Sequence, residues 1–165
     1  MNERQLKARP LTAERFAPYG DVIETGRPDG AMNEARFERF DDLCRLDAGD
    51  GRLAVSIARS RTPSLLPYRI DFVERHPLGS QAFVPLSPFR LIVVVAPPGE
   101  SVDAADLVAF ETNGLQGINY HRGTWHMPLL AFAAGQRYLI IDRASGAPNC
   151  DIHALDEPVM LVADP

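Results

Sequence analysis

The residues best suited to chemistry in this sequence lie in two short segments, and one of them is NYHRGTWHMP, residues 119–128. It holds two of the four histidines, His121 and His126, together with Tyr120 and the only tryptophan, Trp125. An imidazole titrates near neutral pH and also binds divalent metals. The segment therefore offers acid–base chemistry or metal ligation, although a lone histidine is more often a structural residue.

The other segment is VERHPLGSQ, in which Glu74 and His76 stand two residues apart. In a strand over residues 68–76, side chains two apart share a face, and the face of Glu74 also carries an apolar stripe. This stripe consists of Tyr68, Ile70 and Phe72. Two interpretations stay open here. If the face points inward, the carboxylate needs a partner, a metal or water, because a buried unpaired charge is costly. Otherwise the strand leaves the core at Glu74 and both groups face solvent.

Three of the four histidines thus belong to two segments that a barrel could bring face to face. Such a set suits a metal site or acid–base catalysis near neutral pH. The spacing matches neither a zinc finger nor the helical HExxH pattern. No P-loop, GxGxxG or GxSxG motif occurs, which argues against a nucleotide or redox cofactor and against a serine hydrolase.

Two further candidates rest on single residues. The guanidinium of Arg59 could bind a small carboxylate substrate, although most arginines simply lie on the surface. Cys150 could act as a nucleophile only if its pKa were lowered, and such a cysteine is more often a small buried residue.

The composition is that of one globular domain covering residues 1–165. A net charge of -5 predicts no surface for nucleic acid. No apolar run approaches the ~20 residues of a membrane-spanning helix, and the N-terminus has no signal-peptide pattern. Cys44 and Cys150 are far apart in the sequence, which indicates reduced thiols in a cytoplasmic protein with no membrane partner.

Many short strands must position these groups. Alternating patterns predict strands at residues 52–59 and 68–76, and a continuous apolar run predicts a buried strand at 90–98. Short helices are predicted at residues 11–21, from Thr12 to Gly20, and at 104–110. Further short strands are predicted at 81–86, after the Asn113-Gly114 turn, and at 128–134, 137–143, 150–155 and 158–162. The fold class is therefore all-β, a sandwich or barrel with a few short helices.

Both chemical segments resemble the two motifs of cupins. HRGTWH is similar to the second motif, Pro-x-Gly-x-x-His, with His121 in the place of the proline and His126 at the ligand position. ERHPLGSQ is similar to the first motif, His-x-His-(x)4-Glu, with Glu74, His76 and Gln81 at its three polar positions. The chain departs from the usual three-histidine set of cupins at Glu74 and Gln81.

A closer resemblance covers nearly the whole chain, from LTAERFAPYGDVIE to DEPVMLV, through ERHPLGSQAFVPL, TNGLQGINYHRGTWHMPL and IDRASGAPNCDI. Through these segments the sequence resembles the ureidoglycolate lyase family. The resemblance implies a cupin-like β-barrel, usually a homodimer in the cytoplasm, that splits (S)-ureidoglycolate into glyoxylate and urea. It also implies a divalent metal, described as nickel for some members.

Ureidoglycolate is a hemiaminal, so its cleavage needs a base for the hydroxyl proton and an acid for the departing nitrogen. Given the resemblance, we expect His126 to line the barrel mouth around the hemiaminal carbon with His76, Glu74 and Gln81. If a metal is bound, the same four residues are its expected ligands.

The other roles fall to neighbouring residues. Tyr120 or His121 would protonate the leaving nitrogen, and the sequence does not choose between them. Arg59 is the candidate for the substrate carboxylate, and Trp125 is expected in the wall of the substrate pocket.

Two other functions stay open. A ureidoglycolate hydrolase would release ammonia and carbon dioxide and would need an activated water. A non-catalytic cupin that binds small carboxylates would keep the pocket without turnover. The length of the resemblance favours the lyase.

Overall fold

Short β-strands make up most of the chain in the computed structural model, which describes residues 4–163. The described part of the chain contains two helical turns, α1 (Ala13–Phe16) and η1 (Ala104–Asp106). The strands are β1 (Arg4–Pro10), β2 (Gly20–Ile23), β3 (Gly30–Met32), β4 (Phe37–Arg39), β5 (Arg52–Arg59), β6 (Tyr68–Arg75), β7 (Gln81–Pro85), β8 (Ile92–Ala96), β9 (Val108–Glu111), β10 (Gly117–Tyr120), β11 (Trp125–His126), β12 (Arg137–Ala144) and β13 (Asp151–Val162). The predicted all-β, cupin-like fold class is confirmed.

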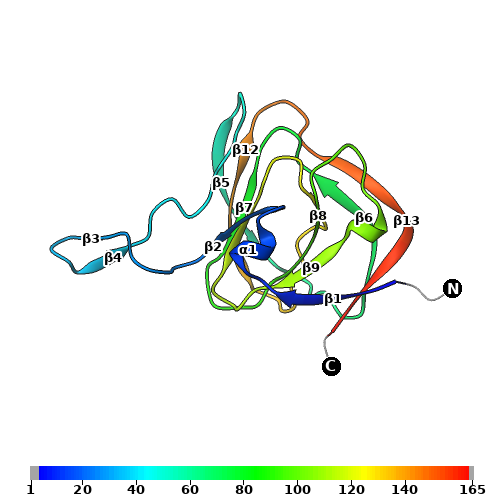
Figure 1. Cartoon of the computed structure of the whole chain (residues 1–165), viewed down its shortest axis with the longest axis horizontal. Helices are drawn as coiled ribbons and strands as arrows, with labels where there is room; N and C mark the ends of the chain where they lie inside the picture. Colours follow the sequence, from blue (N-terminus) through cyan, green and yellow to red (C-terminus); the bar gives the residue numbers. More distant parts are fainter. Residues whose placement is uncertain (1–3, 164–165) are drawn as a thin grey trace.

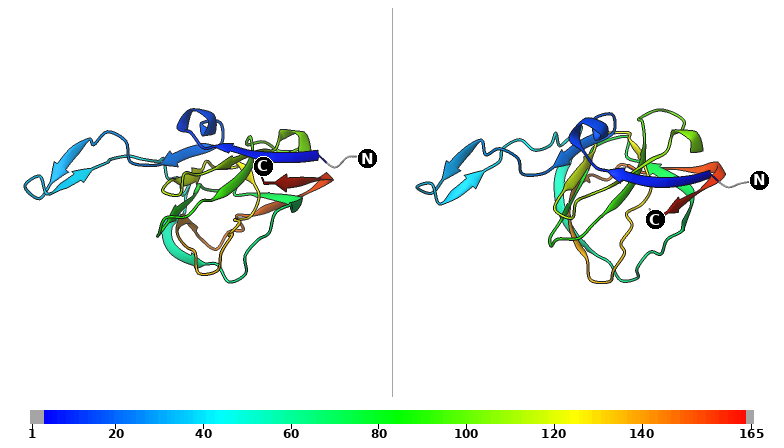
Figure 2. Two further views of the ribbon diagram at one scale, coloured as in Figure 1. Left: turned by 90° about the horizontal axis from the view of Figure 1, so that it is seen from below. Right: turned by 60° about the horizontal axis from the view of Figure 1, so that its bottom comes forward.

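The strands form a barrel and a sheet that lie side by side (Figure 1). The closed barrel has the order β1-β13-β6-β11-β8-β9, and the five-stranded sheet has the order β2-β10-β7-β12-β5. β3 and β4 form a separate hairpin that extends away from both (Figure 2). Segments far apart in the sequence, such as β6 and β11, are therefore neighbours in the barrel.

Two apolar cores result from this arrangement, and β8 contributes to both. Val94 and Ala96 point into the barrel, whereas Val93 and Val95 pack against the five-stranded sheet. All five residues of β8 are buried, as the continuous apolar run predicted. The second core is rich in aromatic rings from both sides, and it includes Phe16, Phe83, Phe110, Tyr120 and Tyr138.

The regular alternation predicted for β6 is wrong at Phe72. Ile70 and Val73 are buried in the barrel core, but Phe72 is exposed. The pairing with β13 shifts register here, because several residues of β13 are inserted between the partner of Phe72 and the partner of Ile70. This irregularity lets Ile70 and Val73, three residues apart, both face the barrel interior, and Glu74, the next residue, points to the other side of β6.

The predicted helices are shorter than expected. Thr12 caps α1, and its Oγ1 accepts a hydrogen bond from the Arg15 N–H at 3.3 Å. α1 ends at Phe16, because Gly20 already belongs to β2. The predicted helix at 104–110 is only the turn η1, followed by the strand β9.

Candidate active site

The strand β11 holds His126 at the junction of barrel and sheet. His126 pairs with Glu74 on one side and with Val95 on the other. Gly123 makes the bend before it, with a φ of 77°, and donates its N–H to the His76 carbonyl at 2.9 Å. This left-handed conformation favours glycine, so the sequence permits the turn that brings the two chemical segments together.

Trp125 and His126 are adjacent in a strand and therefore point to opposite faces. Trp125 is buried in the barrel core, and its Nε1 donates to the Gly99 carbonyl at 3.0 Å. The Arg75 guanidinium lies over its ring, 4.9 Å from the centroid. Trp125 thus packs the barrel and does not join His126 in a pocket wall.

Four of the residues singled out in the sequence come together here. The His126 Nε2 lies 3.5 Å from Oε1 of Glu74, and the His76 Nε2 lies 4.0 Å from the same oxygen. The Gln81 Oε1 is 3.1 Å from the His76 Nε2. The first interpretation of Glu74 holds only in part: the carboxylate is partly buried and has imidazole partners, but it lies on the side of β6 opposite the barrel-core residue Val73 and does not continue a stripe through Phe72.

Main-chain carbonyls determine the tautomers of both imidazoles. The His126 Nδ1 lies 2.9 Å from the Thr124 carbonyl, and the His76 Nδ1 lies 2.6 Å from the Asn149 carbonyl. A carbonyl oxygen only accepts, so each Nδ1 carries a proton and donates. In the neutral ring each Nε2 then carries an unprotonated lone pair. Both Nε2 atoms face the Glu74 Oε1, and the His76 Nε2 also faces the Gln81 Oε1.

A cation would suit this convergence of acceptors. The His126 Nε2 is buried and has no hydrogen-bond partner among the described residues. Ligand atoms of Glu74, His76 and His126 all lie within 4.8 Å of one another. Two imidazole nitrogens with a carboxylate oxygen are ordinary ligands of divalent transition metals, and hydrogen-bonded Nδ1 groups are usual in such sites. The donor set therefore fits a divalent metal ion.

The electrostatics of Glu74 favour its ionised form. A His126 imidazole protonated at Nε2 would donate to Glu74 and hold the pKa of this carboxyl below its usual value, although burial opposes the shift. The thiol of Cys150 lies 3.7 Å from the Glu74 Oε2. Burial, followed by the charge of Glu74, raises the pKa of that thiol, which argues against a nucleophilic cysteine. Cys150 is exposed, and the expectation of a buried residue is wrong.

Tyr120 forms one wall of the cluster. Its ring stacks on His126 with centroids 4.2 Å apart and an interplanar angle of 14°. Burial, together with the charge of Glu74, raises the pKa of the phenol, which therefore stays protonated. Tyr120 belongs to β10 of the five-stranded sheet, so the candidate site is built from both the barrel and the sheet.

Comparison with known proteins assigns the chain that carries this cluster to a family. The family model for ureidoglycolate lyase matches residues 3–162. The chain belongs to the ureidoglycolate lyase family. It is 43% identical to a protein named ureidoglycolate lyase from Pseudomonas syringae pv. tomato over 165 residues, which is 98% of this chain and 96% of that protein. It is also 43% identical, over 164 residues, to proteins of the same name from Pseudomonas aeruginosa and Burkholderia mallei. Those alignments cover 98% of this chain and 97% and 95% of the two proteins.

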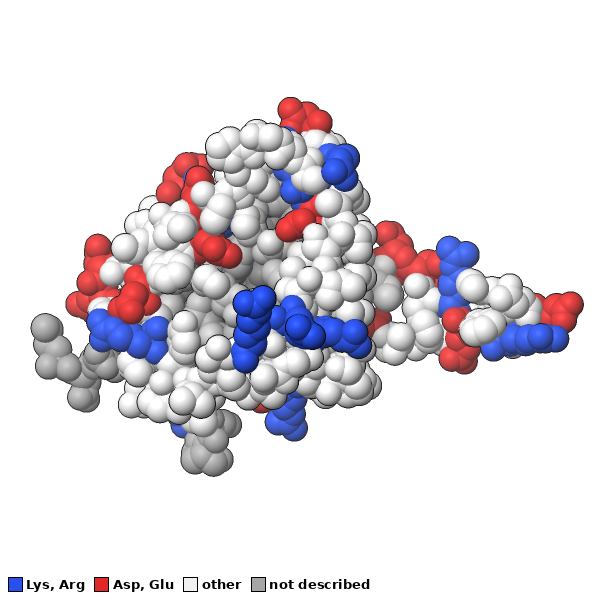
Figure 3. Space-filling model, turned by 180° about the vertical axis from the view of Figure 1, so that it is seen from behind, with Lys and Arg blue, Asp and Glu red and all other residues white. Residues whose placement is uncertain are grey.

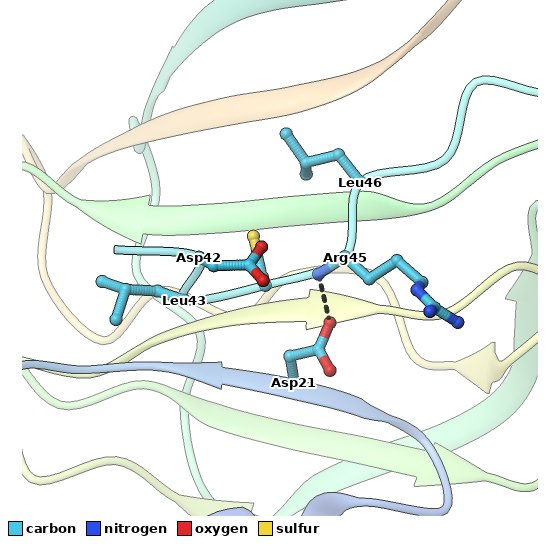
Figure 4. A pocket seen from close by; sticks show the side chains of 6 residues that line it. Asp21, Asp42, Leu43, Arg45 and Leu46 are labelled. Carbon is cyan, nitrogen blue, oxygen red and sulfur yellow. Dashed lines mark hydrogen bonds between the residues drawn. The ribbon is translucent and has the colours of Figure 1, made fainter. Parts of the chain in front are cut away.

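His121 lies apart from the cluster of Glu74, His76, Gln81 and His126. Its Nε2 contacts the Asp21 Oδ1 at 3.0 Å, near the start of β2. Asp21 also accepts hydrogen bonds from the Arg45 N–H at 2.9 Å and from the Asn119 Nδ2 at 3.0 Å. Asp21 and residues 42–46 line a separate pocket, shown in Figure 4 with the bond to Arg45. His121 thus lies with Asp21 and Asn119, whereas its neighbour Tyr120 faces His126.

Arg59 is also distant from the cluster along the sheet. It ends β5 and pairs with Arg137, whereas Gln81 pairs with Asp142, five residues further along β12. At the ~3.3 Å rise of a strand residue, that offset separates them by roughly 16 Å. The structure does not bring Arg59 to the residues around Glu74.

Two supporting residues are brought in from distant segments. The Asp142 Oδ2 accepts from the Gln81 Nε2 at 3.3 Å, which turns the Gln81 Oε1 toward His76. The Asn149 side chain accepts the Leu78 N–H at 2.7 Å while its carbonyl orients His76. Sequence analysis did not identify either residue, because nothing in the segment IDRASGAPNC indicates which partners Asp142 and Asn149 meet.

Proposed function

We propose that the protein cleaves ureidoglycolate into glyoxylate and urea. The observation that carries this proposal is the convergence of Glu74, His76, Gln81 and His126 in a chain of the ureidoglycolate lyase family. Full-length relatives at 43% identity bear the name of that activity. A hemiaminal substrate needs proton transfers, and this cluster offers imidazoles in defined tautomers.

The reaction balances without water or a redox partner. A base removes the proton from the hydroxyl group, and the oxygen lone pair forms the carbonyl of glyoxylate. The bond between that carbon and the urea nitrogen breaks, and its electron pair stays on nitrogen. A proton delivered to the nitrogen completes urea, which would otherwise be a poor leaving group.

His76 is the residue we propose as the base. Its Nδ1 donates to the Asn149 carbonyl, so the Nε2 alone is free to accept a proton. It is also more exposed than His126, with 15% of its side chain accessible against 2%. Glu74 stabilises the resulting imidazolium, because its ionised carboxylate lies 4.0 Å away.

Tyr120 is the residue we propose as the acid. Sequence analysis had left Tyr120 and His121 as alternatives, and only Tyr120 lies against His126. Burial and the charge of Glu74 raise the pKa of its phenol, so the phenol is protonated before the reaction and holds the proton that a general acid must supply to the departing nitrogen.

Glu74, His76, Gln81 and His126 would hold a divalent ion, with nickel suggested by the family resemblance. Such an ion would supply a Lewis acid that lowers the pKa of the substrate hydroxyl and binds its carboxylate. The buried Nε2 of His126, which lacks a partner, supports this assignment. The His76 Nε2 has a single lone pair, so its role as base applies to the protein without the ion, and with the ion bound His76 would be a ligand instead.

We further propose a cytoplasmic homodimer in which residues 1–165 act as one domain. Family resemblance supports the dimer and the compartment, and the two unpaired cysteines, Cys44 and Cys150, agree with a reducing environment. No helix among residues 4–163 has the length and apolar character needed to cross a membrane.

The test supplies purified protein with racemic ureidoglycolate and follows glyoxylate, urea and ammonia together. Equal amounts of glyoxylate and urea from one enantiomer are expected. Release of ammonia in place of urea would identify a hydrolase and overturn the proposal, as would the absence of turnover. Parallel assays with a chelator, followed by nickel or another divalent ion, establish whether the metal is required.

A further inference from the structure

Residues 24–42 form an arm that leaves the body after β2. Among the described strands, β3 and β4 pair only with each other, and residues 25–39 are all exposed. The arm projects from the side of the body where β2, β7, β12 and β5 lie (Figures 1 and 2). A two-stranded hairpin alone is at best marginally stable in water. The arm pairs with no other described strand, so contact with another molecule would stabilise it.

Apolar side chains lie at the end of the arm. Met32 and Phe37 pair across the hairpin, and they are 41% and 56% exposed. Cross-strand partners share one face of the ribbon, so the two side chains form a single apolar contact point. Neither belongs to the two apolar cores, which leaves this contact point available to another molecule.

The outer face of the five-stranded sheet is a second uncovered apolar surface. Val55 and Ile57 of β5 are 66% and 64% exposed. They pair with Ile141 and Leu139 of β12, and Leu139 pairs with Val84 of β7. The five side chains therefore point to one face, which we call the outer sheet face. An apolar patch that spans three strands marks an interaction site.

The charges of the arm and of the edge strand are complementary. Residues 24–42 contain six acidic and three basic side chains, and both kinds lie along the arm in Figure 3. Residues 52–61 carry Arg52, Arg59 and Arg61 and no acidic residue, and Arg137 lies opposite Arg59. Among the strands of residues 4–163, β5 pairs only with β12 and therefore has a free edge. Each copy of the chain thus offers both halves of a matched contact.

We propose that the outer sheet face binds a second copy of this chain, with the arm of each copy lying along β5 of the other. A two-fold axis satisfies both contacts at once, since the same two surfaces are used twice. Met32 and Phe37 then meet the apolar outer sheet face, and the acidic arm lies beside the arginines of β5. This inference gives the proposed homodimer its surface and is independent of the proposed reaction.

The test measures the oligomeric state of the full chain by sedimentation equilibrium at micromolar concentration. Wild-type protein is expected to be a dimer. Val55→Asp/Ile57→Asp alters only exposed side chains and is expected to yield a folded monomer, because buried apolar anchors dominate interface energies. Met32→Ser/Phe37→Ser is expected to weaken the dimer roughly tenfold or more. Leu115→Asp is the matched control, since Leu115 is 71% exposed in the loop before β10 and lies outside both surfaces.

A photo-crosslinker in place of Phe37, used in a mixture of isotopically light and heavy protein, identifies the contact directly. Mixed-label crosslinks to residues 52–61 or 137–141 are expected. A monomeric wild type, a dimer unaffected by either double variant, or crosslinks confined to one chain would overturn the proposal. Substrate is absent from these measurements, so failure of the proposed lyase reaction leaves them unchanged.

Discussion

The imidazoles of His76 and His126 owe their orientation to main-chain carbonyls. The acceptors are the carbonyl oxygens of Asn149 and Thr124, which no side-chain substitution removes. The tautomers therefore depend on the positions of the loops, and the reactive Nε2 atoms remain directed at Glu74 as long as those loops hold. Sequence motifs identified these histidines, but the carbonyl partners were beyond prediction because they lie in loops without a pattern.

Asp21 provides a prediction about stability and pH. Burial raises the pKa of Asp21, but hydrogen bonds from the Arg45 N–H, Asn119 and His121 outweigh it, so the pKa lies below its ordinary value. A lowered pKa means that the ionised group stabilises the fold above its unfolded pKa of about 3.9, and that this stabilisation is lost as the pH falls through the folded value. Asp21→Ala is thus expected to lower the free energy of unfolding by about 1–2 kcal/mol at neutral pH.

Urea unfolding of wild type and Asp21→Ala at neutral and at acidic pH measures this difference. The expected difference in unfolding free energy shrinks toward zero below the folded pKa of Asp21, and a difference that stays constant with pH would contradict the assignment.

His121→Ala is expected to keep the lyase activity within about threefold, because His121 contacts Asp21 and lies apart from the cluster.

The loop before β13 positions His76 through one residue, Asn149. Asn149 accepts the Leu78 N–H through its side chain and orients His76 through its carbonyl. Asn149→Ala is expected to reduce kcat/KM for ureidoglycolate roughly tenfold, since groups that orient a reactive histidine typically contribute tenfold or more. Asn149→Asp keeps the acceptor oxygen and is expected to restore most of the activity. Equal activity in wild type and the alanine variant would show that the loop does not position His76.

The turn before β11 makes a separate prediction. Gly123 has a φ of 77°, and the nearest atom to an added Cβ would be the Pro98 Cβ at 3.8 Å. Gly123→Ala therefore causes no clash, and only backbone strain of about 1–2 kcal/mol is expected. Thermal or urea unfolding measures the loss. Gly146→Ala is the control, because its surroundings are open and its backbone is unstrained. Equal losses in both variants would contradict the role of the bend.

Prediction from the sequence succeeded where a local pattern determined the structure. The run in β8 and the alternation in β5 predicted strands, and both are present. Phe72 escaped prediction because the register shift lies in β13, far along the chain. His121 was grouped with His126 because the two are close in sequence. Side chains alternate along β10, however, so Tyr120 faces His126, whereas Asn119 and His121 lie on the other side with Asp21. Residues 24–42 lack any apolar alternation, and the arm was not predicted.

At the scale of the whole molecule, the site lies where barrel and sheet meet. Glu74, His76 and His126 come with the barrel strands, and Gln81 and Tyr120 come with the sheet. The aromatic core beneath them holds the two parts together, with Tyr120 stacked on His126 at its boundary. Length and composition predicted a core of this size, but only the strand order determines which residues meet at the boundary.

The measurement that tests the account most directly is kcat/KM for ureidoglycolate in His126→Ala, with His153→Ala as the matched control. His153 lies against Trp125, with ring centroids 5.8 Å apart, and outside the cluster. Circular dichroism and cooperative unfolding first establish that both variants are folded. A loss of roughly a hundredfold or more is predicted for His126→Ala, with little change for His153→Ala. Normal turnover in a folded His126→Ala protein would contradict the assignment of the reaction to this cluster.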